Sequence, residues 1–310
     1  MTDSNDLPAP PTIDARAAER WRLHAPALSP WLHEEVGQRM QARLQWIKRQ
    51  PAAWANWSPL RGGLRTHAEV AERYPEARVH LVEPGAAHAE AALAALAPRQ
   101  PWWQRLRRAG GDPPAWSADG QGLQVDMVWS NMQLHAAGQP QRLMRQWCDS
   151  LVADGFLMFS CLGPDTVREL RALYQRLGWP VAGHEFTDMH DWGDMLVQAG
   201  FAEPVMDMER IVLTYDSPAR LLQELRELGR NLHPGRFPAL RGRGWRARLE
   251  DAIGEQLATP ESDGRLALTF EVIYGHAFKA PPRMPVASDS RIALDDMRSL
   301  LRSGKKPVRP

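Results

Sequence analysis

Short apolar runs alternate along the chain with longer segments in which apolar residues recur every three or four positions. Between Trp21 and Ile47 this spacing, with Arg and Glu in the intervening positions, is typical of amphipathic helices. The short runs predict strands at 52–57, 77–84, 125–134 and 155–162, and the segments between them predict helices that include 86–97 and 139–153. This alternation indicates parallel strands joined by crossover helices, which is the pattern of an α/β fold.

Two capping boxes predict where helices begin. Thr66 with Glu69, and Thr166 with Glu169, have the spacing at which each side chain can bind the backbone N–H of the other residue. We therefore expect one helix to begin at Thr66, just after the first strand, and another to begin just after the glycine and proline that follow the fourth strand.

The regular alternation ends near residue 215. The remaining elements are predicted as a helix near 190–199, a strand at 203–215, helices at 217–229 and 245–257, and a last strand at 265–279. Because the last two helices are inserted between two strands, we expect residues 216–262 to form a lid over the functional edge of the sheet.

One folded domain is expected to span residues 13–280, with a helical N-terminal segment at 13–50. The two ends of the chain, 1–12 and 281–310, are rich in Pro, Ser and charged residues, so we expect both to be disordered.

Composition excludes several classes of partner. The 310 residues carry 38 Lys and Arg against 37 Asp and Glu, and a net charge of +1 provides no broad basic field for a nucleic acid or an anionic membrane. The polar N-terminus lacks a signal peptide's apolar core, and no run approaches the roughly 18 apolar residues of a membrane span. The two cysteines, Cys148 and Cys161, favour a reducing compartment over a disulfide scaffold, so we expect a cytoplasmic protein.

In an open parallel sheet a ligand binds outside the carboxyl ends of the strands. Gly62 and Gly63 follow the first strand and allow close approach to the backbone beside a helix N-terminus. At the end of the second strand, the carboxylate of Glu83 can accept both hydroxyls of a ribose. Asp119 can accept the amine of an adenine, and Ser130 and Asn131, at the end of the strand predicted at 125–134, would form the floor of the site.

Each of these candidates also has a purely structural interpretation. The glycine pair and Asp119-Gly120 are ordinary turn sequences, Glu83 before a proline can simply terminate a strand, and Ser130-Asn131 can cap one. Both interpretations stay open at this point.

Two other groups of residues have competing interpretations. Four residues near one helix start could suggest a metal site, but acids there are more simply explained by capping and the helix dipole, so we expect no metal. They are Asp188, His190, Asp191 and Asp194.

The arginine-rich run at 236–248 is either a solvated face or a docking site for an acidic partner. The sequence contains no G-x-S-x-G, H-E-x-x-H, paired C-x-x-C or G-x-x-x-x-G-K-[ST] motif, which argues against hydrolase, zinc and nucleoside triphosphatase functions.

Five stretches resemble the malonyl-[acyl-carrier protein] O-methyltransferases of biotin synthesis, which are class I S-adenosylmethionine-dependent methyltransferases. The stretches are WLHEEVGQRMQARLQWIKRQP, VDMVWSNMQLH, GFLMFSCLGPDTVRELR, FTDMHDWGDMLVQAGFAEPVMDMERIVLTY and TFEVIYGHAFK. The similarity covers most of residues 14–280. It implies a Rossmann-like, seven-stranded doubly wound sheet with an antiparallel last strand, to which the N-terminal helical segment and the lid are added.

The loop after the first strand departs from the family pattern, in which an acid is followed by G-x-G-x-G. Here Asn56 stands in the place of the acid, Ser58 and Leu60 replace glycines, and Pro59 removes a backbone donor.

The acids after the second strand and on the adenine side do match, as Glu83 and Asp119. The resemblance thus implies S-adenosylmethionine as cofactor, bound by Asn56, Ser58, Gly62, Gly63, Glu83, Asp119, Ser130 and Asn131.

The reaction that the resemblance implies is methyl transfer to the free carboxylate of malonyl-acyl-carrier protein or another acyl thioester. A carboxylate is already ionised at neutral pH, so the reaction needs no general base and we assign no catalytic residue. The site does need a donor or cation to orient that carboxylate, and the candidates are His135, Arg236, Arg241 and Arg243. The acidic carrier would contact the segment 236–248, and we expect the chain to act as a monomer.

The altered loop leaves other hypotheses open. One is a catalytically inactive relative that keeps the fold as a binding or assembly module without the family's cofactor binding. Another is different chemistry, as in the methyltransferase-like hydroxylases of respiratory complex assembly, which resemble the same family.

Overall fold

The structure is a computed structural model that describes residues 13–97, 115–258 and 262–281. All of its helices and strands belong to one unit, Met1–Ala280. The predicted tail at 1–12 lies outside the described residues, and so does the tail at 281–310 apart from Pro281.

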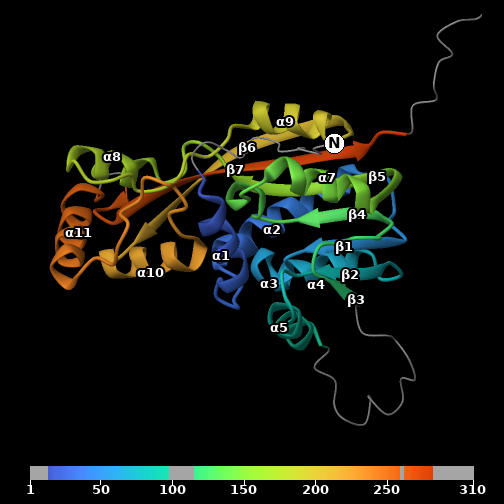
Figure 1. Ribbon diagram of the computed structural model, residues 1–310, viewed down its shortest axis with the longest axis horizontal. Coiled ribbons are helices and arrows are strands. Elements are labelled where there is room, and N and C mark those ends of the chain that lie inside the picture. Colours follow the sequence, from blue (N-terminus) through green and yellow to red (C-terminus); the bar gives the residue numbers. More distant parts are fainter. Residues whose placement is uncertain (1–12, 98–114, 259–261, 282–310) are drawn as a thin grey trace, which may run out of the picture. The chain divides into compact units, whose positions relative to one another are not determined.

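Seven strands form one sheet in the order β3-β2-β1-β4-β5-β7-β6 (Figure 1). The strands are β1 (Ala53–Trp57), β2 (Arg78–Val82), β3 (Ala115–Ser117), β4 (Val125–Ser130), β5 (Leu151–Leu162), β6 (Phe201–Tyr215) and β7 (Leu266–Lys279). The first five strands pair in parallel, whereas β7 is antiparallel to both β5 and β6. This is the predicted doubly wound sheet with an antiparallel last strand, and the fold prediction is confirmed.

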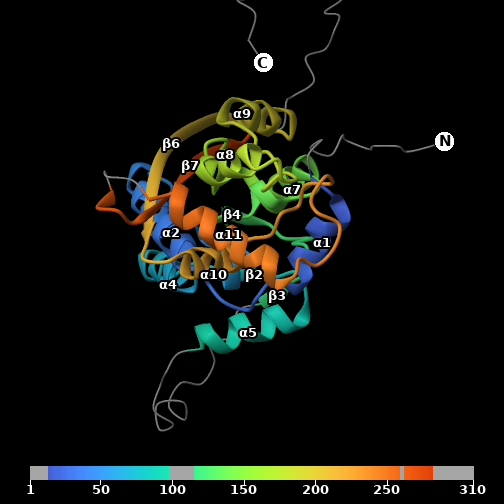
Figure 2. The ribbon, with the colours of Figure 1, turned by 90° about the vertical axis from the view of Figure 1, so that its left-hand side faces the viewer.

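Helices cover both faces of the sheet (Figure 2). They are α1 (Ala15–His24), α2 (Trp31–Arg43), α3 (Pro59–Gly62), α4 (Leu64–Arg73), α5 (Ala86–Leu96), α7 (Pro140–Ser150), α8 (Arg168–Arg176), α9 (Met189–Gln198), α10 (Pro218–Leu228) and α11 (Arg243–Gln256). Two short 3₁₀ helices, η1 (Leu44–Trp46) and η2 (Leu134–Ala136), complete the described elements.

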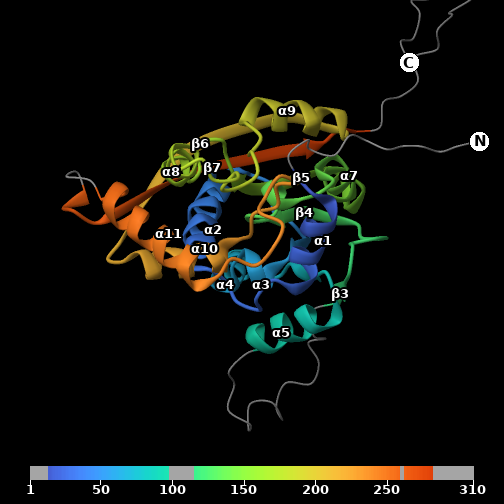
Figure 3. The same cartoon turned by 60° about the vertical axis from the view of Figure 1, so that its left-hand side comes forward.

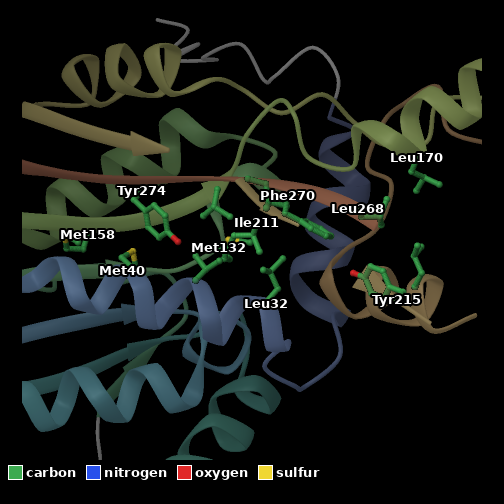
Figure 4. Packing of buried hydrophobic residues seen from close by; sticks show 14 of the residues in the cluster. Leu32, Met40, Met132, Met158, Leu170, Ile211, Tyr215, Leu268, Phe270 and Tyr274 are labelled. Atoms are coloured by element: carbon green, nitrogen blue, oxygen red, sulfur yellow. The ribbon is translucent and has the colours of Figure 1, made fainter. Parts of the chain in front are cut away.

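Alternate residues of the buried strands build two cores, because successive side chains point to opposite faces of a sheet. On one face, Met40 of α2 packs with Met158 and Tyr274 of the sheet in a cluster that extends to the lid helices (Figure 4). On the other face, Trp147 of α7 and Trp192 of α9 pack on β4, β5 and β7. The period of the apolar positions therefore fixes which face each helix covers.

Both capping-box predictions are wrong. The helix predicted to begin at Thr66 is α4, which begins at Leu64. Its first-turn N–H groups at Arg65 and Thr66 donate to the carboxylate of Glu34 on α2, each at 3.1 Å. Glu69 instead lies 3.8 Å from Arg65 in an i,i+4 ion pair. A side chain from a distant helix thus replaces the local cap.

The side chains of the second predicted capping box bond to strand β7 instead of to the helix backbone. The helix α8 begins at Arg168, after Val167 in the left-handed conformation with φ of 49°. Thr166 Oγ1 donates to Glu271 O at 3.1 Å, and Glu169 accepts from the backbone and hydroxyl of Thr269 on β7.

Most other boundaries agree with the sequence, with two exceptions. The apolar run at 125–134 is a strand only to Ser130, and its last residues form η2. The helix predicted at 139–153 ends at Ser150, and β5 begins at Leu151 instead of residue 155.

The predicted lid helices, α10 and α11, lie between β6 and β7 in the sequence, as expected. The segment after α10 contacts the start of α1 (Figure 3). Asp14 N donates to Leu232 O at 2.8 Å, and the guanidinium of Arg236 pairs with the carboxylate of Asp14 at 2.9 Å. The lid region and the N-terminal segment are therefore in direct contact.

The close approach of β7 to its neighbours leads to a stability prediction. A Cβ added at Gly275 would lie 2.6 Å from Cζ of Phe159 and 2.8 Å from Sδ of Met206. We expect Gly275→Ala to lower the free energy of unfolding by about 1–3 kcal/mol, because overpacked cores must distort. In the helical control Gly193→Ala the nearest atom would be 4.0 Å away, and about 0.5–1 kcal/mol of stabilisation is expected. Urea unfolding measures both changes, and equal effects of the two substitutions would contradict the packing argument.

Candidate functional site

Strand register brings the predicted cofactor residues to one edge of the sheet. Trp57 lies beside both Val82 and Ser130, and Val82 lies beside Ser117, so β1 to β4 end together. The residues that the sequence singled out follow or include these strand ends. They are Asn56, Ser58, Gly62, Gly63, Glu83, Asp119, Ser130 and Asn131.

The loop after β1 folds into a single buried helical turn. Ser58 is left-handed, with φ of 53°, Gly63 has φ of 125°, and the four residues of α3 between them are all buried. Gly62 N donates to Ser58 O at 2.7 Å, and Gly63 N donates to Pro59 O at 3.1 Å. Pro59 is tolerated because the first residue of a helix needs no N–H partner.

Glu83 caps this turn. Its side chain is only 1% exposed, and its Oε1 accepts from Leu60 N at 2.8 Å. Its other oxygen, Oε2, has no hydrogen-bond partner among the described residues. Burial raises the pKa of Glu83 from its ordinary value of 4.5 to about 7, although the Leu60 N–H bond acts in the opposite direction.

The side chain of Asn131 binds the backbone of the loop. Its amide donates to His33 O at 2.7 Å and to Gly62 O, and its Oδ1 accepts from Ser160 Oγ at 2.5 Å. All hydrogen-bonding atoms of this side chain are therefore used within the protein. Asn56 is also committed, since its amide lies 2.9 Å from Nδ1 of His67.

Arg61 joins the loop to two other parts of the chain. Its guanidinium donates to Pro26 O and Leu28 O at 3.5 and 3.3 Å, and to Glu227 O and Leu228 O of α10 at 2.6 and 3.2 Å. Sequence analysis did not identify this residue, because nothing near it in the sequence indicates four distant carbonyl partners. Burial, together with the charge of Arg230, lowers the pKa of Arg61 to about 10.

Side chains of the loop occupy the space beside it. Leu60 is 2% exposed and packs with Leu81 and Ala92. Trp57 is 6% exposed, and its ring lies against Gly120, where an added Cβ would be 2.6 Å from the indole. The positive φ of Gly120, 71°, belongs to a turn in which Asp119 accepts from Gln121 N at 3.1 Å.

The residues fit the implied cofactor in part. Two buried oxygens at this edge, Glu83 Oε2 and Ser130 Oγ, have no partner among the described residues, and both suit the hydroxyl groups of a nucleoside. The loop fits less well in this conformation, because the buried side chains of Leu60 and Trp57 fill the space beside the carboxylate, and Leu60 N already donates to its Oε1.

His135 lies at the same edge, in η2, among residues that sequence analysis missed. His184 Nε2 donates to His135 O at 3.1 Å, and the ring of Phe186 lies 5.8 Å from that of His135 and 4.8 Å from that of His184. Arg171 Nη2 donates to His184 O at 3.1 Å. These residues come from separate segments, so only the fold brings them together.

The three predicted lid arginines have different environments. Arg236 is paired with Asp14, and Arg241 stacks on Phe237 and Trp245 at 4.5 and 3.9 Å from the ring centroids. Arg243 begins α11 and is exposed. The structure therefore leaves Arg243 the more accessible of the three to a partner.

Asp188 caps α9 by accepting from His190 N and Asp191 N at 2.7 and 3.1 Å, as the capping interpretation predicted. Within residues 13–97, 115–258 and 262–281, no group of three or more His, Cys, Asp or Glu side chains is placed to hold a metal ion. None of the helices that the structure describes is both long enough and apolar enough to cross a membrane.

The chain is similar to several curated proteins named malonyl-[acyl-carrier protein] O-methyltransferase. It is 39% identical to the one from Gallionella capsiferriformans over 288 residues, which cover 87% of this chain and 90% of the relative. It is 38% identical to the one from Laribacter hongkongensis over 281 residues, covering 87% and 88% of the two chains.

Among solved structures, the YcgJ protein of Bacillus subtilis matches 79% of this chain and 99% of its own, with 11% identity and a TM-score of 0.50. This likeness supports the fold alone. No family model matches the chain.

The buried carboxyl of Glu83 predicts a pH-dependent stability. Its folded-state pKa of about 7 exceeds the ordinary 4.5, so the folded protein binds more protons than the unfolded chain between these pH values. The free energy of unfolding therefore falls as the pH rises through this window, by on the order of 3 kcal/mol in total.

Glu83→Gln should remove this loss, so that the variant gains stability relative to the wild type as the pH rises from 4.5 to 8. Urea unfolding across this range measures the difference, and Glu76→Gln, at an exposed position, is the matched control. Parallel pH profiles for wild type and Glu83→Gln would show that the carboxyl is not desolvated.

Proposed function

The chain belongs to the family of malonyl-[acyl-carrier protein] O-methyltransferases, and on this basis we propose that it transfers a methyl group from S-adenosylmethionine to the carboxylate of a malonyl thioester. The observation that carries the proposal is the similarity, which extends over 90% of one relative and 88% of another. The lid and the last strand are thus inside the proposed catalytic unit.

Chain residues would act mainly by binding and orientation. S-adenosylmethionine, when bound, supplies an electrophilic methyl group on a sulfonium. Glu83 and Ser130 would hold its ribose through the oxygens that lack partners in this structure, and Asp119 would hold the adenine side. An ionised carboxylate attacks without a general base, so positioning and exclusion of water supply the catalysis.

Cofactor binding would require a change in α3. The space filled by Leu60 and Trp57 must become available, and moving Leu60 would also withdraw its N–H from Oε1 of Glu83. Because Arg61 ties the same turn to α10 and to the segment before α2, the change would reach the lid and the N-terminal segment.

The methyl acceptor would contact His135 and the lid. Of the four predicted substrate contacts, His135 is the one bonded to a strand end, since Leu162 N at the end of β5 donates to its Nδ1. An acidic carrier protein would contact the lid, where the exposed Phe237 and the fully exposed Leu240 precede the exposed Arg243 and Arg248 in the sequence. Apolar side chains flanked by arginines suit an acidic helical partner.

Calorimetric titration with S-adenosylmethionine tests the cofactor. We expect micromolar binding by the wild type and at least tenfold weaker binding by Glu83→Ala, since one charge-assisted pair of hydrogen bonds is worth about 1.5–3 kcal/mol. Hydrogen exchange at the Leu60 amide should become faster when the cofactor binds, because its carboxylate partner is withdrawn.

Absence of heat at millimolar cofactor, from a sample that unfolds cooperatively, would refute the cofactor assignment and favour a binding or assembly role. Rescue of a biotin-requiring strain that lacks its own methyltransferase then tests the acceptor. If cofactor binds but growth stays biotin-dependent, the methyl acceptor is a different molecule.

Charge reversal on the lid tests the carrier. The double variant Arg243→Glu, Arg248→Glu should raise KM for a malonyl-carrier protein by about tenfold and leave KM for malonyl-coenzyme A unchanged, because only the carrier reaches the lid surface. Arg78→Glu, an exposed position at the start of β2 and hence at the opposite edge, is the matched control. An equal effect of all three substitutions would exclude a specific docking surface.

A further inference from the structure

Three buried histidines lie together at the carboxyl edge of the sheet, and the proposed chemistry does not use two of them. His33 at the start of α2, His135 in η2 and His184 after α8 are 3%, 9% and 5% exposed. Burial lowers the pKa of all three, His33 to about 3 and His184 to about 4, and the charges of His33 and His184 lower the pKa of His135 further. All three rings are therefore neutral near pH 7, each with one N–H and one lone pair.

Backbone partners fix which ring nitrogen carries the proton. His33 Nδ1 lies 2.7 Å from Arg61 O, and His184 Nε2 lies 3.1 Å from His135 O. A carbonyl oxygen only accepts, so each of these nitrogens must be the N–H donor. His135 is fixed in the opposite sense, because Leu162 N donates to its Nδ1 at 3.3 Å, which leaves Nε2 as its N–H.

Two lone pairs are left without a donor. His33 Nε2 and His184 Nδ1 are buried and have no partner among the described residues. In the same group, the buried Nε–H of Arg171 lacks an acceptor. Unsatisfied buried polar atoms are uncommon in native proteins, and here both acceptors and a donor lack partners. A ligand that satisfies both must carry N–H groups as well as acceptor oxygens.

We propose that His33 and His184 bind the amide N–H groups of the arm that carries the acceptor's thioester, while His135 and Arg171 face its oxygens. A pantetheine-type arm matches this pattern, because each of its amides presents one N–H and one carbonyl. The identity of the thioester rests on the proposed function, but the need for an amide-bearing ligand comes from the histidines alone. The half-buried ring of Phe186, which lies 5.8 Å from that of His135 and 4.8 Å from that of His184, would pack against the arm.

Two substitutions remove the ring nitrogen that carries the unpartnered lone pair and keep the structural hydrogen bond. In His33→Asn the side-chain amide can still donate to Arg61 O, and in His184→Gln it can still donate to His135 O, because these amides reach the positions of Nδ1 and Nε2 respectively. The probes are malonyl-pantetheine and the S-methyl thioester of malonate, which has the same carboxylate and no amide. Calorimetry measures the dissociation constants of both probes.

We expect the wild type to bind malonyl-pantetheine about tenfold more tightly than the short thioester, and each variant to lose about five- to tenfold for the long probe alone. Equal weakening for both probes, or equal wild-type affinity for them, would overturn the assignment of the histidines. His276→Gln, on β7, is the control for a general effect of replacing a histidine. Failure of methyl transfer with this binding pattern intact would refute the proposed function and leave the inference standing.

Discussion

The guanidinium of Arg61 is the contact on which the arrangement of the site depends. It lies in the turn that follows the first strand, and it donates to carbonyls of both the segment before α2 and the last turn of α10. Carbonyls at a helix C-terminus lack intrahelical partners and carry partial negative charge, so a buried cation there satisfies them and is itself compensated. Three parts of the chain separated by about 30 to 170 residues are thus held by one side chain.

Pro59 and Glu83 determine the shape of the altered loop, although in the family the acid at the position of Glu83 binds the cofactor. A glycine-rich loop keeps its backbone open for a cofactor, whereas here a proline begins a short helix and Glu83 caps it. The same carboxylate thus binds the loop through Oε1 and keeps Oε2 without a partner among the described residues. In place of the open G-x-G-x-G loop of the family, this chain has a closed helical turn packed on its own side chains.

Periodicity predicted most of the fold because the sheet and its helices are built from alternating apolar patterns. The prediction of helix starts failed where a distant residue replaced the local cap. The N-terminus of the helix that contains Thr66 is capped by Glu34, and the hydroxyl of Thr166 donates to Glu271 O. That the predicted cofactor residues would converge at one edge of the sheet was predictable, because they follow strand ends in a fixed register. His33 and His184 were not, since their proximity to His135 arises from the packing of separate segments, and no spacing in the sequence records it.

The strand order has a consequence for how the molecule assembles during synthesis. The last strand, β7, lies between β5 and β6, so β6 has no neighbour in the sheet until the lid has been made and β7 has been inserted. An emerging chain must therefore hold a 15-residue strand apart from the sheet while about 50 further residues are translated. During that interval the packing of α9 on β6 is the principal protection of the waiting strand against mispairing.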